Sequence, residues 1–265
     1  MPCMGTAQFK DAFGPYALVA GGSDGLGAAF AEAIARRGLG LVLVARQQQR
    51  LETTAARLRD AYGVDVITQV ADLAEYDAVE RLIAAIEVPV GLLVYNAAFA
   101  PIGLFDATSD DDLAKAVAVN VRSLVLAVKA ASGPMIERGR GGIVIMSSLS
   151  GSYGSPNLAT YSATKSFGAI LAEGLWSELK PHGIDVLACC AGAIMTPGYQ
   201  QAEGGKPAPG TMRPESVAEQ TLAALGHGPV VIPGAVNKIG RFALTRLLSR
   251  RAAISIMSQN TGGLT

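Results

Sequence analysis

Tyr161 and Lys165 are the side chains whose types and spacing best fit acid–base chemistry. Four residues apart on a helix, a phenol and an ammonium lie on the same face. Ser147 and Ser148 lie upstream, at the end of an apolar run of strand length. A phenol, a cation and a hydroxyl placed together can move a proton to or from the oxygen of a carbonyl or an alcohol. The Tyr-x-x-x-Lys spacing alone is a weak signal, so its meaning depends on the rest of the chain.

The composition is that of a large globular domain. The 265 residues are 50% hydrophobic and 17% charged, which allows a sizeable core and excludes global disorder. Lys plus Arg equals Asp plus Glu at 22 each, a balance that argues against a general nucleic-acid binder. We expect a single domain over residues 1–265, with its core at about 16–233 and no internal linker.

We expect a cytoplasmic protein. The N-terminal residues hold no apolar stretch of signal-peptide length, and the longest charge-free apolar run, 88–105, contains two prolines and an asparagine. The cysteines are Cys3, near the terminus, and the adjacent Cys189 and Cys190. Such a set makes neither a disulfide framework nor a zinc site, so we interpret the adjacent pair as small buried side chains.

Strand-length apolar runs alternate with helical patterns along the chain. The expected strands lie at 17–21, 41–45, 64–70, 92–95, 143–147, 184–189 and 230–233. The expected helices lie at 25–37, 47–62, 75–86, 109–131, 157–180 and 214–225. Near-continuous apolar strands between helices are typical of a parallel sheet covered on both faces. The sequence therefore predicts an α/β fold, a doubly wound parallel sheet of about seven strands with helices on both faces.

The helix expected at 109–131 opens with Asp110, Asp111 and Asp112. Such a triplet can bind a metal ion, or it can occupy the first turn of a capped helix, where the helix dipole favours anions. We favour capping and expect no metal.

A glycine-rich loop joins the first strand to the first helix of the sheet. Its sequence is Gly21-Gly22-Ser23-Asp24-Gly25-Leu26-Gly27. Glycines let the backbone approach a pyrophosphate, whose charge then meets the helix N-terminus. After the first strand of an alternating α/β chain, such a loop is a strong signal for a dinucleotide site.

The Gly-x-x-x-Gly-x-Gly spacing resembles that of a short-chain dehydrogenase/reductase of the single-domain type, a family with a Rossmann-like sheet. Further matches follow in the family's order over residues 16–233: Asp72, Tyr95-Asn96-Ala97-Ala98, Asn120, Ser148 thirteen residues before Tyr161, Lys165, and Ala191-Gly192 with Thr196. The joint match is highly specific, although each piece alone is not. Tyr95 stands where the family has Asn, which is expected to alter local hydrogen bonds.

The resemblance implies a catalytic group. Tyr161 would be the general acid/base, and Lys165 would lower the pKa of this phenol and hold the nicotinamide ribose. Ser148 would hydrogen-bond the substrate oxygen. Asn120 would support a water that links Lys165 to solvent.

The resemblance also implies the cofactor-binding residues. Asp72 would meet the adenine, and Thr196 the nicotinamide carboxamide. The full set comprises Gly21, Ser23, Asp24, Gly25, Leu26, Gly27, Arg46, Asp72, Leu73, Asn96, Ala97, Ala98, Tyr161, Lys165, Ala191, Gly192, Ile194 and Thr196.

The position after the second strand indicates which nicotinamide binds. An acidic residue there would hydrogen-bond the ribose 2′-OH of NAD and repel a 2′-phosphate. This chain has Ala45 and then Arg46, whose planar fork matches a phosphate, and Ser23 adds a hydroxyl. The sequence therefore predicts NADP(H).

Three segments are expected to form the substrate pocket: the loop 193–213, as a lid, with 99–105 and 150–158. They offer an apolar lining with no evident Arg or Lys for a carboxylate or phosphate, namely Phe99, Ile102, Phe105, Tyr153 and Leu158. A hydrophobic ketone or secondary alcohol is the expected substrate.

The C-terminal tail, about 237–265, is basic and amphipathic. It resembles the extra segment of short-chain enzymes that act on lipids and steroids, and its cations are Lys238, Arg241, Arg246, Arg250 and Arg251. Such a helix can lie on a membrane surface, pack on a partner subunit or fold over the pocket. The resemblance implies a homodimer or homotetramer formed through the two long helices.

The leading hypothesis is an NADP(H)-dependent oxidoreductase that interconverts a hydrophobic ketone and a secondary alcohol. Two alternatives are a non-catalytic cofactor-binding regulator and a lipid-surface protein that works through its tail. The intact Ser148, Tyr161 and Lys165 argue against the regulator.

Overall fold

A seven-stranded parallel sheet runs through the molecule in the order β3-β2-β1-β4-β5-β6-β7. The structure is a computed structural model, which describes residues 4–196 and 208–261. The strands are β1 Tyr16–Ala20, β2 Gly40–Ala45, β3 Val66–Val70, β4 Val90–Tyr95, β5 Gly141–Ser148, β6 Ile184–Ala191 and β7 Val230–Val231. The predicted doubly wound sheet is confirmed.

The strand order reverses between β1 and β4, which lie side by side in the sheet. Leu18 of β1 pairs with Val42 of β2 on one side and with Leu93 of β4 on the other. In sheets of this kind, ligands bind beyond the carboxyl ends of the strands at the point of reversal. The fold therefore places a binding crevice beyond β1 and β4.

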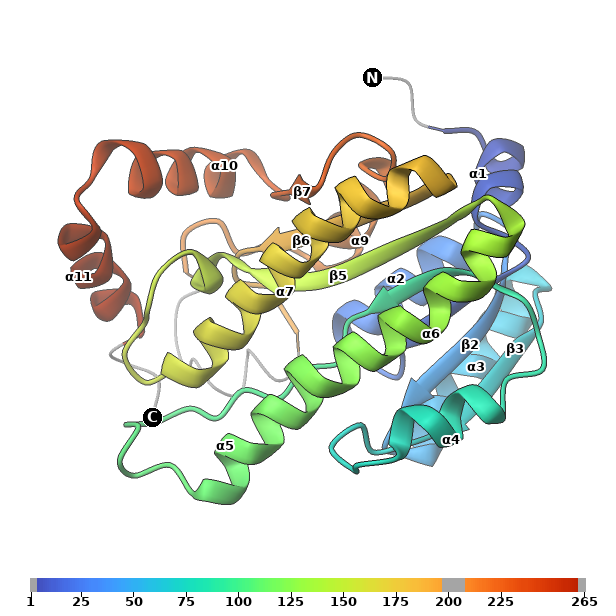
Figure 1. Ribbon diagram of the computed structural model, residues 1–265, viewed down its shortest axis with the longest axis horizontal. Coiled ribbons are helices and arrows are strands. Elements are labelled where there is room, and N and C mark those ends of the chain that lie inside the picture. Colours follow the sequence, from blue (N-terminus) through green and yellow to red (C-terminus); the bar gives the residue numbers. More distant parts are fainter. Residues whose placement is uncertain (1–3, 197–207, 262–265) are drawn as a thin grey trace.

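Helices cover both faces of the sheet, as Figure 1 shows. One face packs against α1 Thr6–Phe13, α2 Gly25–Ala35, α3 Gln48–Tyr62 and α9 Pro214–Ala223, and the other against α4 Ala78–Ala84, α6 Ser123–Arg138 and α7 Ala159–Leu179. Successive strand residues point to opposite faces. Leu41 and Leu43 of β2 accordingly join one core, whereas Val42 and Val44 join the other.

Helix α1 was not among the predicted elements. It buries Phe9 and Phe13, whose ring centroids lie 4.9 Å apart in an edge-to-face arrangement. The glycines Gly91 and Gly142 admit it, because an added Cβ would lie 2.3 Å from the Phe13 carbonyl oxygen at Gly91 and 2.8 Å from the Phe13 ring at Gly142. The segment has only eight residues, of which half are polar, so its helical pattern is weak in the sequence.

The single helix predicted at 109–131 is interrupted. It consists of α5 Asp110–Val117, the π-helical turn Ala118–Arg122 and α6. Ser109 caps α5, and its Oγ accepts a hydrogen bond from the Asp112 amide at 3.2 Å. The acidic triplet thus lies in a capped first turn. Across 4–196 and 208–261, no group of three or more His, Cys, Asp or Glu side chains is placed to hold a metal ion.

The tail forms α10 Ala235–Phe242, a π-helical turn Ala243–Leu247 and α11 Arg250–Thr261, drawn in red at one end of the molecule in Figure 1. Its buried anchor is Asn237, whose Nδ2 donates to the carbonyls of Pro233 at 3.0 Å and Gly210 at 3.1 Å. An added Cβ at Gly192 would lie 2.7 Å from the Asn237 Oδ1. The tail therefore docks on the loop after β6, where glycine leaves room for it.

Docking on its own domain matches the third placement expected for the tail, folding over the pocket. The outer face of α10 carries the exposed Ile239 and Phe242. Contact of this face with a membrane surface stays a prediction. In the part of the chain that the structure describes, no helix has the length and apolar character needed to cross a membrane.

Candidate active site

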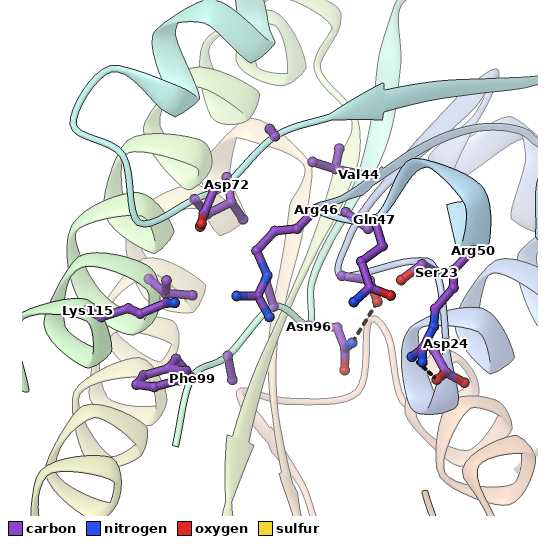
Figure 2. Close-up of a pocket in the computed structure, with 17 residues that line it drawn as sticks. Ser23, Asp24, Val44, Arg46, Gln47, Arg50, Asp72, Asn96, Phe99 and Lys115 are labelled. Atoms are coloured by element: carbon purple, nitrogen blue, oxygen red, sulfur yellow. Dashed lines mark hydrogen bonds and ion pairs between the residues drawn. The ribbon is translucent and has the colours of Figure 1, made fainter. Parts of the chain in front are cut away.

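A cavity of about 330 Å³ opens beyond the carboxyl ends of the first four strands (Figure 2). Its walls come from the segments after β1, β2, β3 and β4, which meet there because parallel strands end at the same edge. Nine of the predicted cofactor residues line it: Gly21, Ser23, Asp24, Arg46, Asp72, Leu73, Asn96, Ala97 and Ala98. We refer to this space as the first cavity.

The glycine loop is shaped for close approach by a ligand backbone. Gly21 has φ +80°, and an added Cβ would lie 3.0 Å from the Ala97 amide nitrogen. Asn96 ties the two loops together by donating from Nδ2 to the Gly21 carbonyl at 3.1 Å, as Figure 2 shows. Asp24 caps α2, whose N-terminus provides amide donors for an anion. These features fit the pyrophosphate of a dinucleotide.

The remaining glycine-loop residues have a packing role in the structure. Gly25, Leu26 and Gly27 begin α2 and do not line the first cavity. At Gly27 an added Cβ would lie 1.7 Å from the Gly21 carbonyl oxygen, so the helix packs directly on the loop.

Three cations line the first cavity. Arg46 is exposed and reaches into the cavity in Figure 2, with no ion pair to any described carboxylate. Arg50 pairs with Asp24 at 3.3 Å, and the Lys115 Nζ lies 4.9 Å from the centroid of the Phe99 ring. Arg50 and Lys115 were not predicted. The Arg46–Arg50 spacing is a signal for the former, whereas Lys115 enters from a distant helix.

The predicted catalytic side chains lie where β5 packs on α7. Ser148 ends β5, and its hydroxyl is close enough to Tyr161 of α7 to lower the pKa of that phenol. Lys165, one turn further along α7, is 7% exposed and donates from Nζ to the Met146 carbonyl at 2.8 Å. The neighbouring Ser147 donates from Oγ to the Lys165 carbonyl at 2.7 Å. Ser147 thereby fixes α7 to β5, whereas the Ser148 Oγ accepts hydrogen bonds from the Ser150 amide at 3.2 Å and the Ser150 Oγ at 2.9 Å.

Burial shifts both titrating groups away from their charged forms. It raises the pKa of Tyr161 to about 12, against a smaller lowering by the hydrogen bond with Ser148. It lowers the pKa of Lys165 to about 8. The lowering of this pKa expected from Lys165 stays a prediction. The Lys165 Nζ donates to the Met146 carbonyl and lies 5.5 Å from the centroid of the Tyr161 ring.

Asn120 lies in the π-helical turn, and its amide is fully engaged with protein groups. Oδ1 accepts from the Phe99 amide at 2.8 Å, while Nδ2 donates to the Phe99 carbonyl at 2.8 Å and to the Thr164 Oγ1 at 3.0 Å. The side chain therefore links the wall of the first cavity to α7 beside Lys165. The expected support of a water would have to come from its backbone.

Tyr95 reaches the same π-helical turn from β4. Its buried hydroxyl donates to the Val119 carbonyl at 2.6 Å, and burial raises the pKa of this phenol. Tyr95, which stands where the family has Asn, thus anchors the turn that carries Asn120. No local pattern in the sequence reveals a contact of this range.

A second cavity, also of about 330 Å³, is lined by Ser148 and by the tail. Its lining residues are Ser148, Leu149, Ser150, Ser152, Gly192, Ala193, Pro209, Val236, Asn237, Gly240, Arg241, Leu244 and Met257. Two of the three segments predicted for the substrate pocket contribute to it: 150–158 through Ser150 and Ser152, and 193–213 through Ala193 and Pro209. No residue of 99–105 lines it, and the tail supplies a wall that was not predicted.

None of the five residues predicted to line the substrate pocket lines the second cavity. Phe99 lines the first cavity, and Ile102 and Phe105 are exposed. Tyr153 donates to the Leu244 carbonyl at 2.8 Å and so fastens the tail, and Leu158 does not line the second cavity.

The loop after β6 contributes to the second cavity at both of its ends. Ile194 and Met212 form a parallel bridge, and the Met212 amide donates to the Ala193 carbonyl at 3.0 Å. Of the predicted cofactor residues here, Gly192 lines the second cavity, whereas Ala191, Ile194 and Thr196 line neither. The part of the predicted lid at 197–207 lies outside the described residues.

Comparison with known proteins agrees with this arrangement. A family model described as short chain dehydrogenase matches residues 15–206. A 7beta-hydroxysteroid dehydrogenase from Clostridium sardiniense is 29% identical over 234 residues, which covers 87% of this chain and 90% of that protein.

Solved structures agree as well. One, from work on 7beta-hydroxysteroid dehydrogenase stereoselectivity, superposes with a TM-score of 0.88 at 26% identity and covers 94% of this chain and 98% of that chain. A short-chain dehydrogenase from Sphingobium yanoikuyae in complex with NADPH gives a TM-score of 0.79 at 31% identity, covering 91% of this chain and 95% of that one.

The family match spans well over half of the chain, and the solved relatives share its sheet and helices. This family match is consistent with the glycine loop, with the strand order and with the grouping of Ser148, Tyr161 and Lys165. The chain belongs to the short-chain dehydrogenase/reductase family and is an oxidoreductase of that family.

Proposed function

We propose that this enzyme uses NADP(H) and interconverts a hydrophobic ketone and the matching secondary alcohol. The observation that carries the proposal is the position of Ser148, which lines the second cavity and lies beside Tyr161. In this proposal a substrate oxygen in the cavity binds the Ser148 hydroxyl and reaches the hydroxyl of Tyr161. The cavity also offers apolar side chains to a hydrophobic substrate, among them Leu149 and Leu244.

When bound, the nicotinamide supplies or accepts the hydride. The protein handles the proton. Ser148 orients the substrate oxygen, and Tyr161 donates a proton to it in reduction or accepts one in oxidation. With its pKa raised to about 12, Tyr161 is a protonated phenol near neutral pH and is poised as the acid for reduction. Lys165 holds α7 on β5 and offers Nζ–H donors close to the Tyr161 ring.

The preference for NADP(H) is supported by the charges of the first cavity. Arg46 follows β2, where an acidic residue would favour NAD, and it has no described carboxylate partner. Arg50 and Ser23 line the same wall. A 2′-phosphate would find a guanidinium fork and a hydroxyl there.

We also propose a homodimer or homotetramer. Helices α6 and α7 carry exposed apolar side chains that face away from the sheet, among them Leu126, Phe167 and Ile170. Ile170 is 65% exposed. A second copy of the chain packed on these helices would remove this surface from water.

Tyr161→Phe tests the acid–base role. Removing the phenol oxygen is expected to lower kcat for ketone reduction by about 10²- to 10⁴-fold, because the alkoxide then lacks its proton donor. NADPH oxidation is followed by absorbance across a panel of hydrophobic ketones, and NADPH binding by fluorescence. Tyr76→Phe, at a residue 84% exposed, is the matched control. Undiminished turnover by a folded, NADPH-binding Tyr161→Phe enzyme would contradict the assignment.

Arg46→Ala tests the cofactor preference. Loss of a charge-assisted contact of about 1.5–3 kcal/mol is expected to weaken NADPH binding by about 10- to 100-fold while NADH binding changes little. Titration of both cofactors by fluorescence measures the two dissociation constants. Arg57→Ala is the control, since Arg57 pairs with Glu32 and does not line the cavity. Equal weakening of the two cofactors would argue that Arg46 has a structural role only.

Lys165→Met tests the buried ammonium. The pKa of Lys165 is about 8 in the folded protein, against 10.5 ordinarily, so the unfolded chain holds more protons between these values. Stability of the wild type should therefore rise relative to the variant as pH increases from about 8 to 10.5, by on the order of 3 kcal/mol. Urea unfolding over this range measures the difference, with the exposed Lys129→Met as control. Parallel pH profiles for wild type and Lys165→Met would refute it.

Ile170→Lys tests the proposed assembly. A charge on the exposed face of α7 is expected to shift the protein toward monomer, because it would have to be buried in the subunit interface. Sedimentation velocity of the two proteins at the same concentration gives the answer. The outcome that rejects this interface is an unchanged dimer or tetramer.

A further inference from the structure

The inner face of α10 directs one cation at the second cavity. Asn237 on this face is buried and fixed by its bonds to Pro233 and Gly210. Arg241 follows four residues later, one turn along the same face, and lines the cavity together with Gly240 and Leu244. The placement of Arg241 therefore depends on the anchor that docks the tail.

Among the described residues that line the second cavity, Arg241 alone carries a formal charge. The other polar residues there are three serines and Asn237, and several are already engaged. Ser150 donates to the Ser148 Oγ at 2.9 Å, and Asn237 donates to two backbone carbonyls.

The charge of Arg241 has no described counter-ion. Its side chain is half-buried, and it makes no ion pair with any carboxylate in 4–196 or 208–261. The sequence holds no Asp or Glu after Glu219, so the tail supplies none. Burial raises the pKa of the Cys190 thiol near the end of β6, and the Arg241 charge is among the smaller effects that oppose this rise. The positive charge of Arg241 is therefore felt by a buried group of the sheet, the Cys190 thiol.

The other tail cations have different surroundings. The Arg250 guanidinium lies 5.5 Å from the centroid of the Tyr153 ring, and Lys238, Arg246 and Arg251 are exposed. None of these four lines the second cavity. Arg241 alone combines partial burial, a mostly apolar cavity and a free fork of donors, which is the setting in which a guanidinium binds a carboxylate bidentately.

We propose that Arg241 is a specificity-determining residue that binds a carboxylate of the substrate, so that the preferred substrate is a hydrophobic keto acid or hydroxy acid. Ser148 and Tyr161 hold the reacting oxygen, and Arg241 holds the acid group across the apolar part of the cavity. The expectation of a pocket without an Arg is thereby revised, because the tail supplies one. This inference rests on the proposed ketone–alcohol function of the same site.

Paired substrates test it. A series of ω-phenyl-ω-oxoalkanoic acids of increasing chain length is compared with the methyl esters, which keep the ketone and lose the charge. Wild type is expected to favour the acid of matching length. In Arg241→Gln, kcat/KM for that acid should fall by about 10- to 100-fold, mostly through KM, while kcat/KM for the ester stays within about threefold. Arg241→Lys should restore part of the preference, and Arg246→Gln, at an exposed tail cation, should behave as wild type.

The outcomes separate this inference from the proposed function. Turnover of acids and esters by wild type without preference, or an equal loss of both in Arg241→Gln, overturns the role of Arg241 and leaves the oxidoreductase intact. If wild type turns over neither, calorimetric binding of the same acids in the presence of NADP⁺ decides. Tighter binding of an acid than of its ester, lost in Arg241→Gln, supports the inference, and equal binding overturns it.

Discussion

The burial of the Lys165 ammonium is the constraint on which the site depends. A cation taken out of water needs a fixed acceptor, which the Met146 carbonyl of β5 provides. Ser147 of the same strand donates to the backbone carbonyl of Lys165, so β5 and α7 are joined both through the side chain and through the backbone of Lys165. The residue one turn earlier on α7 is Tyr161, which consequently meets Ser148 at the end of that strand. The grouping of the proposed catalytic side chains thus follows from how one helix is fixed to the sheet.

Much of the architecture is predictable from the sequence because its causes are local. Strands buried on both faces require apolar runs, and the turn between β1 and α2 requires glycine, since Gly27 leaves no room for a side chain. Most of the lining of the first cavity was also predictable, because it comes from short segments that directly follow successive strands. Observed strands differ from the predicted ones mainly at their ends: β5, for example, is Gly141–Ser148 where 143–147 was predicted.

The features that the sequence did not reveal depend on contacts between distant segments. The pattern over 109–131 is continuous, yet the helix contains a π-helical turn held by Tyr95, 24 residues before its partner Val119. The substrate pocket was assigned to aromatic residues near the catalytic group in sequence. In the structure the tail covers that end of the sheet and brings Arg241 there. Amphipathic character predicted a helix in the tail but could not tell which of its cations would face inward.

The two cavities draw on separate stretches of the chain, and this has an evolutionary consequence. Of the residues that the structure describes, those that line the first cavity lie between Gly21 and Val119, and those that line the second lie between Ser148 and Met257. The proton-handling groups come from α7 and the strand that enters it. A gene that exchanges its 3′ portion, or accumulates mutations there, can therefore acquire a new substrate while its nucleotide preference is inherited unchanged. Modularity of this kind needs no domain boundary, because the winding of the sheet already separates the two tasks along the polypeptide.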